Sequence, residues 1–281
     1  MFEPLQDEFM RRAIAEMTLI GIAGGALGCW VILYRLSYAA ESLAHSIFPG
    51  LVLAAIAGVP LILGGVPGIV VAALAIAAVA RVPGISREAA VGVVVTTLFG
   101  LGVLLALSPD SPPGIQEILF GDILGPSDAD LGAAAALAIL VGCALALLHG
   151  RLLAGGFDRS AARSLGAAPG STEAALLVLL ALAIVVAVQG LGNLLVVAVF
   201  VGPAAAAREL TERIVPMIAL AVSIAALAGL AGLYLSYYAG TAGGASVALT
   251  IVAFYLLALP TARLLALLRG ERRAPAEATI G

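Results

Sequence analysis

The chain has 281 residues, of which 62% are hydrophobic and 11% are charged, and its formal net charge at pH 7 is −3. Because soluble domains carry about 25% charged residues, this composition excludes an ordinary soluble domain and indicates a polytopic membrane protein. All 14 basic residues are arginine. The absence of lysine excludes both a P-loop nucleotide site and lysine Schiff-base chemistry on this chain.

Nine apolar runs follow one another along the chain. A bilayer core about 30 Å thick requires about 20 apolar residues per helix. The runs cover residues 13–34, 39–58, 60–80, 89–108, 131–153, 173–189, 191–207, 216–238 and 246–268. The runs 173–189 and 191–207 are shorter than a full span, so they could form a tight hairpin or one interrupted element. The sequence predicts an all-α, polytopic transmembrane helix bundle of eight or nine spans in one domain over residues 1–269. A polar, disordered cytoplasmic tail is expected over residues 270–281.

The arginines indicate which loops face the cytoplasm. Arg81 and Arg87 lie in one turn, and Arg151 begins a second arginine-bearing segment that continues to residue 163, whereas the loop 109–130 holds acids and no arginine. Since cytoplasmic loops are enriched in basic residues, we expect the arginine-bearing turns and the C-terminal tail inside and the acidic loop outside. Nine spans would place the N-terminus outside as well. Its acidic start, MFEPLQDEF, is unlike a cleaved signal peptide, so the first run is expected to be a retained span.

The second run contains a carboxylate and an imidazole four residues apart. Glu41 and His45 therefore share a helix face. Pro49 follows, and because proline has no amide hydrogen it leaves the carbonyl of His45 without its helical partner and bends the helix. This pair of ligand types suits zinc, manganese or iron without selecting among them, and a site with few ligands suits transit. In the alternative interpretation, Ser37 caps the helix and the helix dipole stabilises Glu41 in the first turn.

A short polar segment precedes the sixth run. In GFDRSAARSLGAAPG, residues 156–170, Asp158 is a suitable N-cap, residues 159–165 would form about two helical turns, and Gly166 is a natural C-terminal stop. Such a short helix cannot cross a membrane, so we expect it to lie across the cytoplasmic end of the bundle. It could be a structured connector or a coupling helix that receives motion from a cytoplasmic ATPase.

The acidic loop, residues 107–131, has a pattern of its own. Its central part, IQEILFGDIL, has helical spacing between two flanks that are rich in proline and glycine. The loop could be an extracellular cap, a docking face for a delivery protein, or a simple connection.

Five stretches of this chain, taken in order, resemble one transporter family. They are ESLAHSIFPG (41–50), LFGDILG (119–125), FDRSAARSLG (157–166), LLVVAVFVGPAAAAREL (194–210) and LSYYAGTAGGASV (235–247). Together they resemble the integral-membrane permeases of ABC transporters for zinc, manganese or iron. One residue departs from the family's pattern, because its usual aspartate is Glu41 here, which keeps the charge and adds a methylene group.

The resemblance implies site residues and partners. Glu41 and His45 would line the translocation pathway as transient metal ligands. The contacts with a separate ATP-hydrolysing subunit would be made by the coupling segment, with Phe157, Asp158, Arg159, Ala162, Arg163, Leu165 and Gly166. The resemblance also implies a dimer with an identical or related permease, an external metal-binding protein, surrounding membrane lipid, and a location in the bacterial cytoplasmic membrane.

We therefore predict a membrane permease subunit of an ABC importer for zinc, manganese or iron. The chain would not be an enzyme, would bind no cofactor and no nucleic acid, and would carry the divalent metal ion as transported substrate. Three alternatives remain open. They are an importer permease for a metal chelate such as a siderophore or vitamin B12, a proton-coupled secondary transporter in which Glu41 and His45 relay protons, and a structural membrane subunit.

Overall fold

The computed structural model describes residues 3–109, 111–112, 115, 117–121, 123, 125–157, 169–193 and 195–268. Within these ranges the chain is helical and contains no β-strand, so the all-α prediction is confirmed. Eight helices in the described part of the chain are long and apolar enough to cross a membrane, in agreement with the predicted eight or nine spans. The predicted tail over residues 270–281 lies outside the described residues and stays a prediction.

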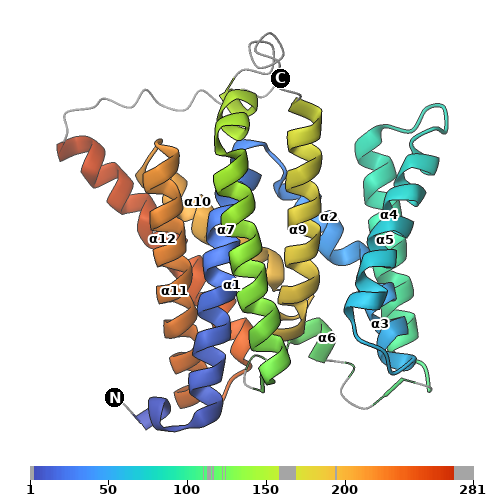
Figure 1. Ribbon diagram of the computed structural model, residues 1–281, viewed down its shortest axis with the longest axis horizontal. Coiled ribbons are helices and arrows are strands. Elements are labelled where there is room, and N and C mark those ends of the chain that lie inside the picture. Colours follow the sequence, from blue (N-terminus) through green and yellow to red (C-terminus); the bar gives the residue numbers. More distant parts are fainter. Residues whose placement is uncertain are drawn as a thin grey trace.

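The helices follow the apolar runs closely (Figure 1). A short 3₁₀ helix, η1 (Glu3–Gln6), comes first. The α-helices are α1 (Glu8–Leu33), α2 (Ser37–Ser46), α3 (Phe48–Ile56), α4 (Ile62–Val79), α5 (Arg87–Ala106), α6 (Glu117–Phe120), α7 (Asp128–Phe157), α9 (Pro169–Leu191), α10 (Val196–Leu210), α11 (Ile214–Ala239) and α12 (Gly243–Leu268).

Two runs differ from simple spans. The run 39–58 forms two helices, α2 and α3, that together make one span. The runs 173–189 and 191–207 form two separate helices, because the chain reverses at Gly192, whose φ is +75°. Helix α9 is longer than its apolar run and reaches full span length, whereas α10 has 15 residues and is about 22 Å long, shorter than the bilayer core.

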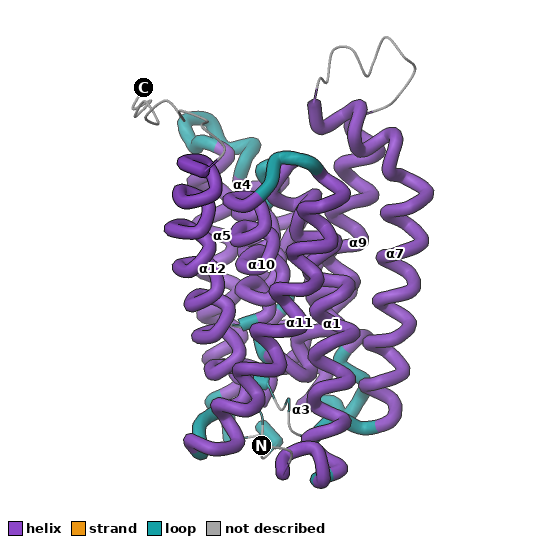
Figure 2. The backbone as a smooth tube through the Cα atoms, turned by 90° about the vertical axis from the view of Figure 1, so that its left-hand side faces the viewer, coloured by secondary structure: helices purple, strands orange, loops and turns teal. Residues whose placement is uncertain are grey.

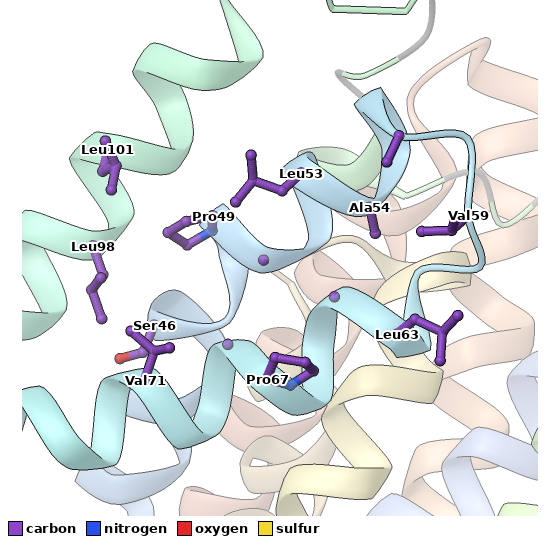
Figure 3. A pocket seen from close by; sticks show the side chains of 14 residues that line it. Ser46, Pro49, Leu53, Ala54, Val59, Leu63, Pro67, Val71, Leu98 and Leu101 are labelled. Carbon is purple, nitrogen blue, oxygen red and sulfur yellow. The ribbon is translucent and has the colours of Figure 1, made fainter.

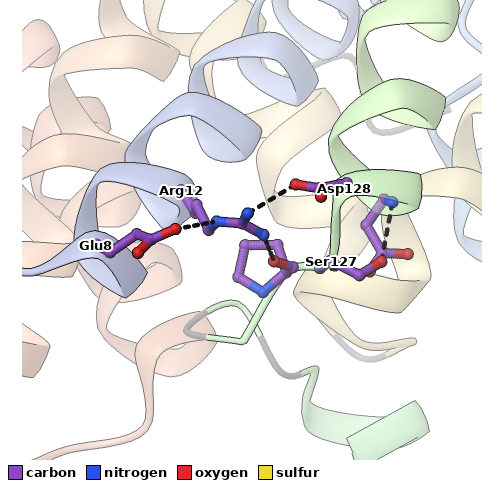
Figure 4. A network of polar contacts seen from close by, with 6 residues as sticks. Glu8, Arg12, Ser127 and Asp128 are labelled. Atoms are coloured by element: carbon purple, nitrogen blue, oxygen red, sulfur yellow. Dashed lines mark hydrogen bonds and ion pairs between the residues drawn. The ribbon is translucent and has the colours of Figure 1, made fainter.

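Polar contacts near the ends of the helices fix the topology. At the start of α1, Arg12 Nη2 lies 2.7 Å from Asp128 Oδ1 at the start of α7 (Figure 4). At the other end, the hydroxyl of Tyr34 donates to the carbonyl of Leu152 over 3.0 Å, so α1 and α7 run parallel. The N-terminus therefore lies at the face where the acidic loop enters α7. The turn between α4 and α5 lies at the opposite face, with the end of α7 (Figure 1).

Helix α1 is the centre of the bundle and packs closely against α10 and α11. Of its most apolar stretch 67% is buried, against 11% for α4. A Cβ atom on Gly28 would overlap the carbonyl of Phe200 in α10, and one on Gly25 would lie 3.0 Å from the backbone of Ala221 in α11. Small residues let helix backbones approach closely where lipid provides no hydrophobic driving force. The glycines of α1 therefore set the spacing of this core.

Helices α3, α4 and α5 form a group at one side of the bundle, and α2 leads into it (Figure 1). Within the group, Gly50 of α3 and Gly64 of α4 pack so closely that a Cβ on either would overlap the other's carbonyl oxygen. Figure 2 shows that the long helices run roughly along one axis, with most loops at the two ends. The break between α2 and α3 therefore lies between the α1-centred core and this lateral group.

Candidate functional site

The second span is interrupted between α2 and α3, close to Pro49, where the sequence predicts a bend. Helix α2 ends at Ser46, Ile47 separates the helices, and Pro49 lies in the first turn of α3. The amide of Ile47 donates to the carbonyl of Leu43 over 3.2 Å. Pro49, however, has no amide hydrogen to offer the carbonyl of His45, as a continuous helix would require. The bend predicted at Pro49 is therefore confirmed as a break between two helices.

The two predicted ligands share the face of α2 that leads up to this break. With a rise of about 1.5 Å per residue, Glu41 lies about 6 Å and His45 about 12 Å along the helix from its first residue. Glu41 is exposed, whereas His45 is partly buried with its ring centroid 5.0 Å from that of Phe99 in α5. The His45 Nδ1 atom is buried and has no hydrogen-bond partner among the described residues. A charged oxygen and an unpartnered ring nitrogen therefore occur one turn apart.

The capping alternative for Glu41 does not fit the structure. The N-cap of α2 is Leu36, no side chain caps the helix, and Ser37 is its first residue. Glu41 is the fifth residue of the helix and lies beyond the first turn, where the effect of the helix dipole is strongest. Dipole stabilisation in a capped first turn therefore does not explain why a carboxylate occurs here.

The described part of this chain does not supply a complete metal coordination sphere. Across the described ranges, no group of three or more histidine, cysteine, aspartate or glutamate side chains could hold a metal ion. Glu41 and His45 would thus be two candidate ligands on one chain. Further ligands for an ion would have to come from water, from backbone oxygens or from another chain, and a site with so few fixed ligands favours release over tight retention.

Two cavities flank the helix break on other faces. One, of about 410 Å³, lies among α3, α4 and α5, and Figure 3 shows Pro49, Pro67 and Leu101 around it. The other, of about 660 Å³, lies among α2, α4, α5 and α9. Ser46 lines both, and its hydroxyl already donates to the carbonyl of Ser42 over 2.6 Å.

Neither Glu41 nor His45 lines either of these cavities. Both residues are rotated about 100° around the axis of α2 from the cavity-lining residues Ser42 and Ser46 that follow them in sequence. The cavity walls are mostly aliphatic and suit hydrocarbon better than an ion. The candidate ligands therefore belong to a separate face of the second span.

The predicted coupling segment begins where α7 ends. Phe157 is the last residue of α7, and α9 begins at Pro169. The other predicted ATPase-coupling residues, Asp158, Arg159, Ala162, Arg163, Leu165 and Gly166, lie outside the described residues. Their role stays a prediction, although the end of α7 does lie at the face that carries the arginine-bearing α4–α5 turn (Figure 1).

The acidic loop contacts the α9–α10 reversal. Its helical part, α6, has only four residues, because glycine and proline interrupt the spacing on both sides. The amide of Asn193 donates to the carbonyl of Ile118 over 2.9 Å. Gly121, with φ +79°, approaches the reversal so closely that a Cβ would overlap the carbonyl oxygen of Gly190. Ile118 and Gly121 of the loop thus fit closely against the reversal.

Replacing Gly121 with alanine is expected to lower the stability of the permease by about 2–5 kcal/mol. The left-handed backbone accounts for about 1–2 kcal/mol, and the collision with residues 190–192 accounts for the rest. The measurement is the thermal unfolding midpoint in detergent. Gly84→Ala is the matched control, since Gly84 has φ +88° and nothing lies within 4 Å of a Cβ placed on it. Equal losses for the two variants would show that the close fit of the loop contributes nothing.

Sequence reasoning did not single out the most buried acid of the described residues. Glu16 of α1 is 2% exposed, and a Cβ on Gly190 would lie 2.7 Å from its Oε1 atom. Asn193 is fully buried, and neither polar atom of its amide group has a hydrogen-bond partner in the described part of the chain. Glu16 is the only acid in the run 13–34. A single acid in an apolar run is the sequence feature that could have identified this residue. These residues form a polar interior at the α9–α10 reversal.

Comparisons with known proteins cover nearly the whole chain. The model of the ABC 3 transport family matches residues 6–262. A "Probable iron transport system membrane protein" of Haemophilus influenzae is 31% identical, over 92% of this chain and 96% of that protein. The "Manganese transport system membrane protein MntC" of Listeria monocytogenes is 30% identical, over 96% of each. The "Chelated iron transport system membrane protein YfeC" of Yersinia pestis is 31% identical, over 90% of this chain and 87% of that protein.

A solved structure shares the architecture. The structure described as "PsaBC from Streptococcus pneumoniae in complex with Fab" superposes with a TM-score of 0.87 at 29% sequence identity, over 95% of this chain and 98% of that chain. The family model, the relatives and the solved structure agree with the multi-pass helical architecture and with the predicted transporter family. This chain is therefore a multi-pass membrane protein that belongs to the ABC 3 transport family.

Proposed function

We propose that this chain is the permease subunit of an ABC importer that moves divalent metal ions, with Glu41 and His45 as transient ligands on the pathway. The proposal is supported by family membership and by relatives that are named as manganese or iron transport proteins. Zinc is retained as a third cargo, because a carboxylate and an imidazole suit all three metals.

The observation that carries the proposal is the exposure of Glu41 in a membrane span. A charged side chain within a membrane span is costly where it faces lipid, so such residues almost always face the bundle interior, a water-filled cavity or another protein. The face of α2 that carries Glu41 therefore requires a wet or protein-covered environment. His45 lies on the same face, one turn further into the span, so an ion in that environment meets both groups.

The energy for transport would come from another chain. Without lysine, this chain has no P-loop lysine for nucleotide binding. A cytoplasmic ATPase subunit would act on the segment 157–166, and its motion would open the Glu41–His45 face to each side of the membrane in turn. A second permease copy would cover that face, and an external metal-binding protein would deliver the ion over the outer loop.

Uptake measurements test this proposal. Cells that express the permease with its partner ATPase should accumulate radioactive manganese, iron or zinc in a process that stops when the ATPase is inactivated and survives a protonophore. A proton-coupled secondary transporter would give the opposite pattern. Uptake of a supplied metal chelate in preference to the free ion would instead favour the chelate importer, the alternative to which the name of the Yersinia pestis relative points.

A further inference from the structure

We propose that Tyr34 is a positioning residue that transmits movement from the end of α7 to the helix carrying Glu41 and His45. This inference rests on the proposed function, because it assumes that an ATPase subunit acts on the segment that follows α7. It concerns a contact at the end of the bundle where α1 and α7 finish, just before α2 begins. The contact joins three helix ends within a few residues of one another.

Tyr34 holds the end of α7 by two contacts. It follows the last residue of α1 and is 7% exposed. Its hydroxyl donates to the carbonyl of Leu152 over 3.0 Å. Its ring packs against Gly156, where a Cβ would lie 3.3 Å from the ring carbon Cε2. Leu152 and Gly156 belong to the final turns of α7, and the chain continues directly from there into the predicted coupling segment.

A second aromatic contact reinforces this junction one turn earlier on α1. The ring of Trp30 meets the ring of His149 of α7 edge-on, with centroids 5.6 Å apart and planes at 83°. Trp30 is 1% exposed, so the contact is part of the core. Trp30 of α1 and Tyr34, which follows α1, thus both contact the last turns of α7, and the two helix ends are expected to move together.

The link from Tyr34 to α2 is a short, fixed turn. The amide of Arg35 donates to the carbonyl of Ile32 over 3.0 Å, and the amide of Leu36 donates to the carbonyl of Val31 over 2.8 Å. Arg35 has φ +57° and is the only non-glycine residue with positive φ in the described part of the chain. A side chain in this left-handed region persists only where the surroundings hold it there. The turn is therefore a constrained connection rather than a flexible linker.

Helix α2 begins immediately after this turn. The carbonyl of Leu36 accepts the amide of Ala40 over 2.9 Å, so the first hydrogen bond of α2 starts from the turn itself. A displacement of the end of α7 thus reaches Glu41 through Tyr34, a two-residue turn and one helical turn. The hydroxyl of Tyr34 donates a hydrogen bond that joins this path to α7. Removing the hydroxyl alone therefore weakens this connection and leaves the tyrosine ring in place.

Replacing Tyr34 with phenylalanine removes that hydroxyl and keeps the ring. The complex of the permease with its ATPase subunit is reconstituted in vesicles with the external binding protein. Manganese ions transported and ATP molecules hydrolysed are then measured in the same sample. We expect the ratio of ions to ATP to fall about fivefold, which corresponds to losing one hydrogen bond worth about 1 kcal/mol. A purely structural defect would lower transport and hydrolysis in proportion and leave the ratio unchanged.

Tyr237→Phe is the matched control. The hydroxyl of Tyr237 donates to Asp7 Oδ2 over 3.0 Å, a similar interhelical contact at the opposite face of the bundle. Its removal is expected to leave the ratio of ions to ATP at the wild-type value. If wild-type vesicles transport manganese and the two variants give the same ratio, the role assigned to Tyr34 is wrong. If wild-type vesicles transport none of the three metals, the proposed function itself fails.

Discussion

Replacing His45 with alanine is expected to reduce metal uptake by at least about 100-fold while the permease remains in the membrane. His45 is the only imidazole on the candidate face, and its Nδ1 atom has no hydrogen-bond partner among the described residues. Loss of a group that merely orients a ligand typically costs 10–100-fold in metal affinity or activity, so loss of the ligand itself should cost more. The measurement is the initial rate of radioactive manganese uptake in whole cells, normalised to the amount of permease.

Two further variants separate ligand loss from a folding defect. His45→Phe keeps an aromatic ring against Phe99, which lies 5.0 Å away between ring centroids, and supplies no metal ligand. It should fold normally and transport as poorly as His45→Ala. The chain's other histidine provides the control, since His149→Phe preserves the edge-on contact with Trp30 and should retain most of the uptake. Rapid uptake by His45→Phe would show that the imidazole is dispensable.

Replacing Gly28 with valine is expected to destabilise the permease strongly and to lower the amount that is recovered folded. The new Cβ would overlap the carbonyl oxygen of Phe200 and lie 3.1 Å from the Cβ of Ala204. No change of rotamer relieves a collision with backbone, so α10 would have to move away from α1. Overpacking of a close core costs about 1–3 kcal/mol or more, a large share of a total stability of about 5–15 kcal/mol. The measurement is the fraction of permease that elutes as a single species on size-exclusion chromatography in detergent.

Gly142→Val in α7 is the matched control for this variant. Gly142 is also a helical glycine in a membrane span, but nothing lies within 4 Å of a Cβ placed there. Valine should be accepted at this position, because it has a higher helix propensity than glycine and meets no neighbour. Normal recovery of the Gly28→Val variant would contradict the close packing of α1 against α10.

The sequence alone predicted the helices and the bend in the second span well, because each depends on local chemistry. Long apolar runs require helices in lipid, where every backbone polar group must be satisfied within the segment. Pro49 withholds one amide hydrogen from α2, and the helix breaks at Ile47 as a result. The pairing of Glu41 with His45 on one face likewise follows from helical spacing alone.

Features that depend on contacts between distant segments were not predictable. The burial of Glu16 depends on its position beside Gly190, far away in the chain. The apolar cavities near Ser46 depend on how α4 and α5 pack against the second span. The length of α9 was underestimated because the helix begins at Pro169 and its first turn contains the polar residues Ser171 and Thr172, which a hydropathy argument assigns to a loop.

The central claim is that His45 coordinates the transported ion, and pulsed electron paramagnetic resonance of bound Mn²⁺ tests it most directly. The permease complex is purified without a histidine tag, loaded with Mn²⁺, and examined for modulation of the electron spin echo by a nearby nitrogen nucleus. The wild-type complex should show imidazole nitrogen modulation that disappears in His45→Phe and persists in His149→Phe. Modulation that is unchanged in His45→Phe, or that is missing from a wild-type complex with bound Mn²⁺, would contradict the claim.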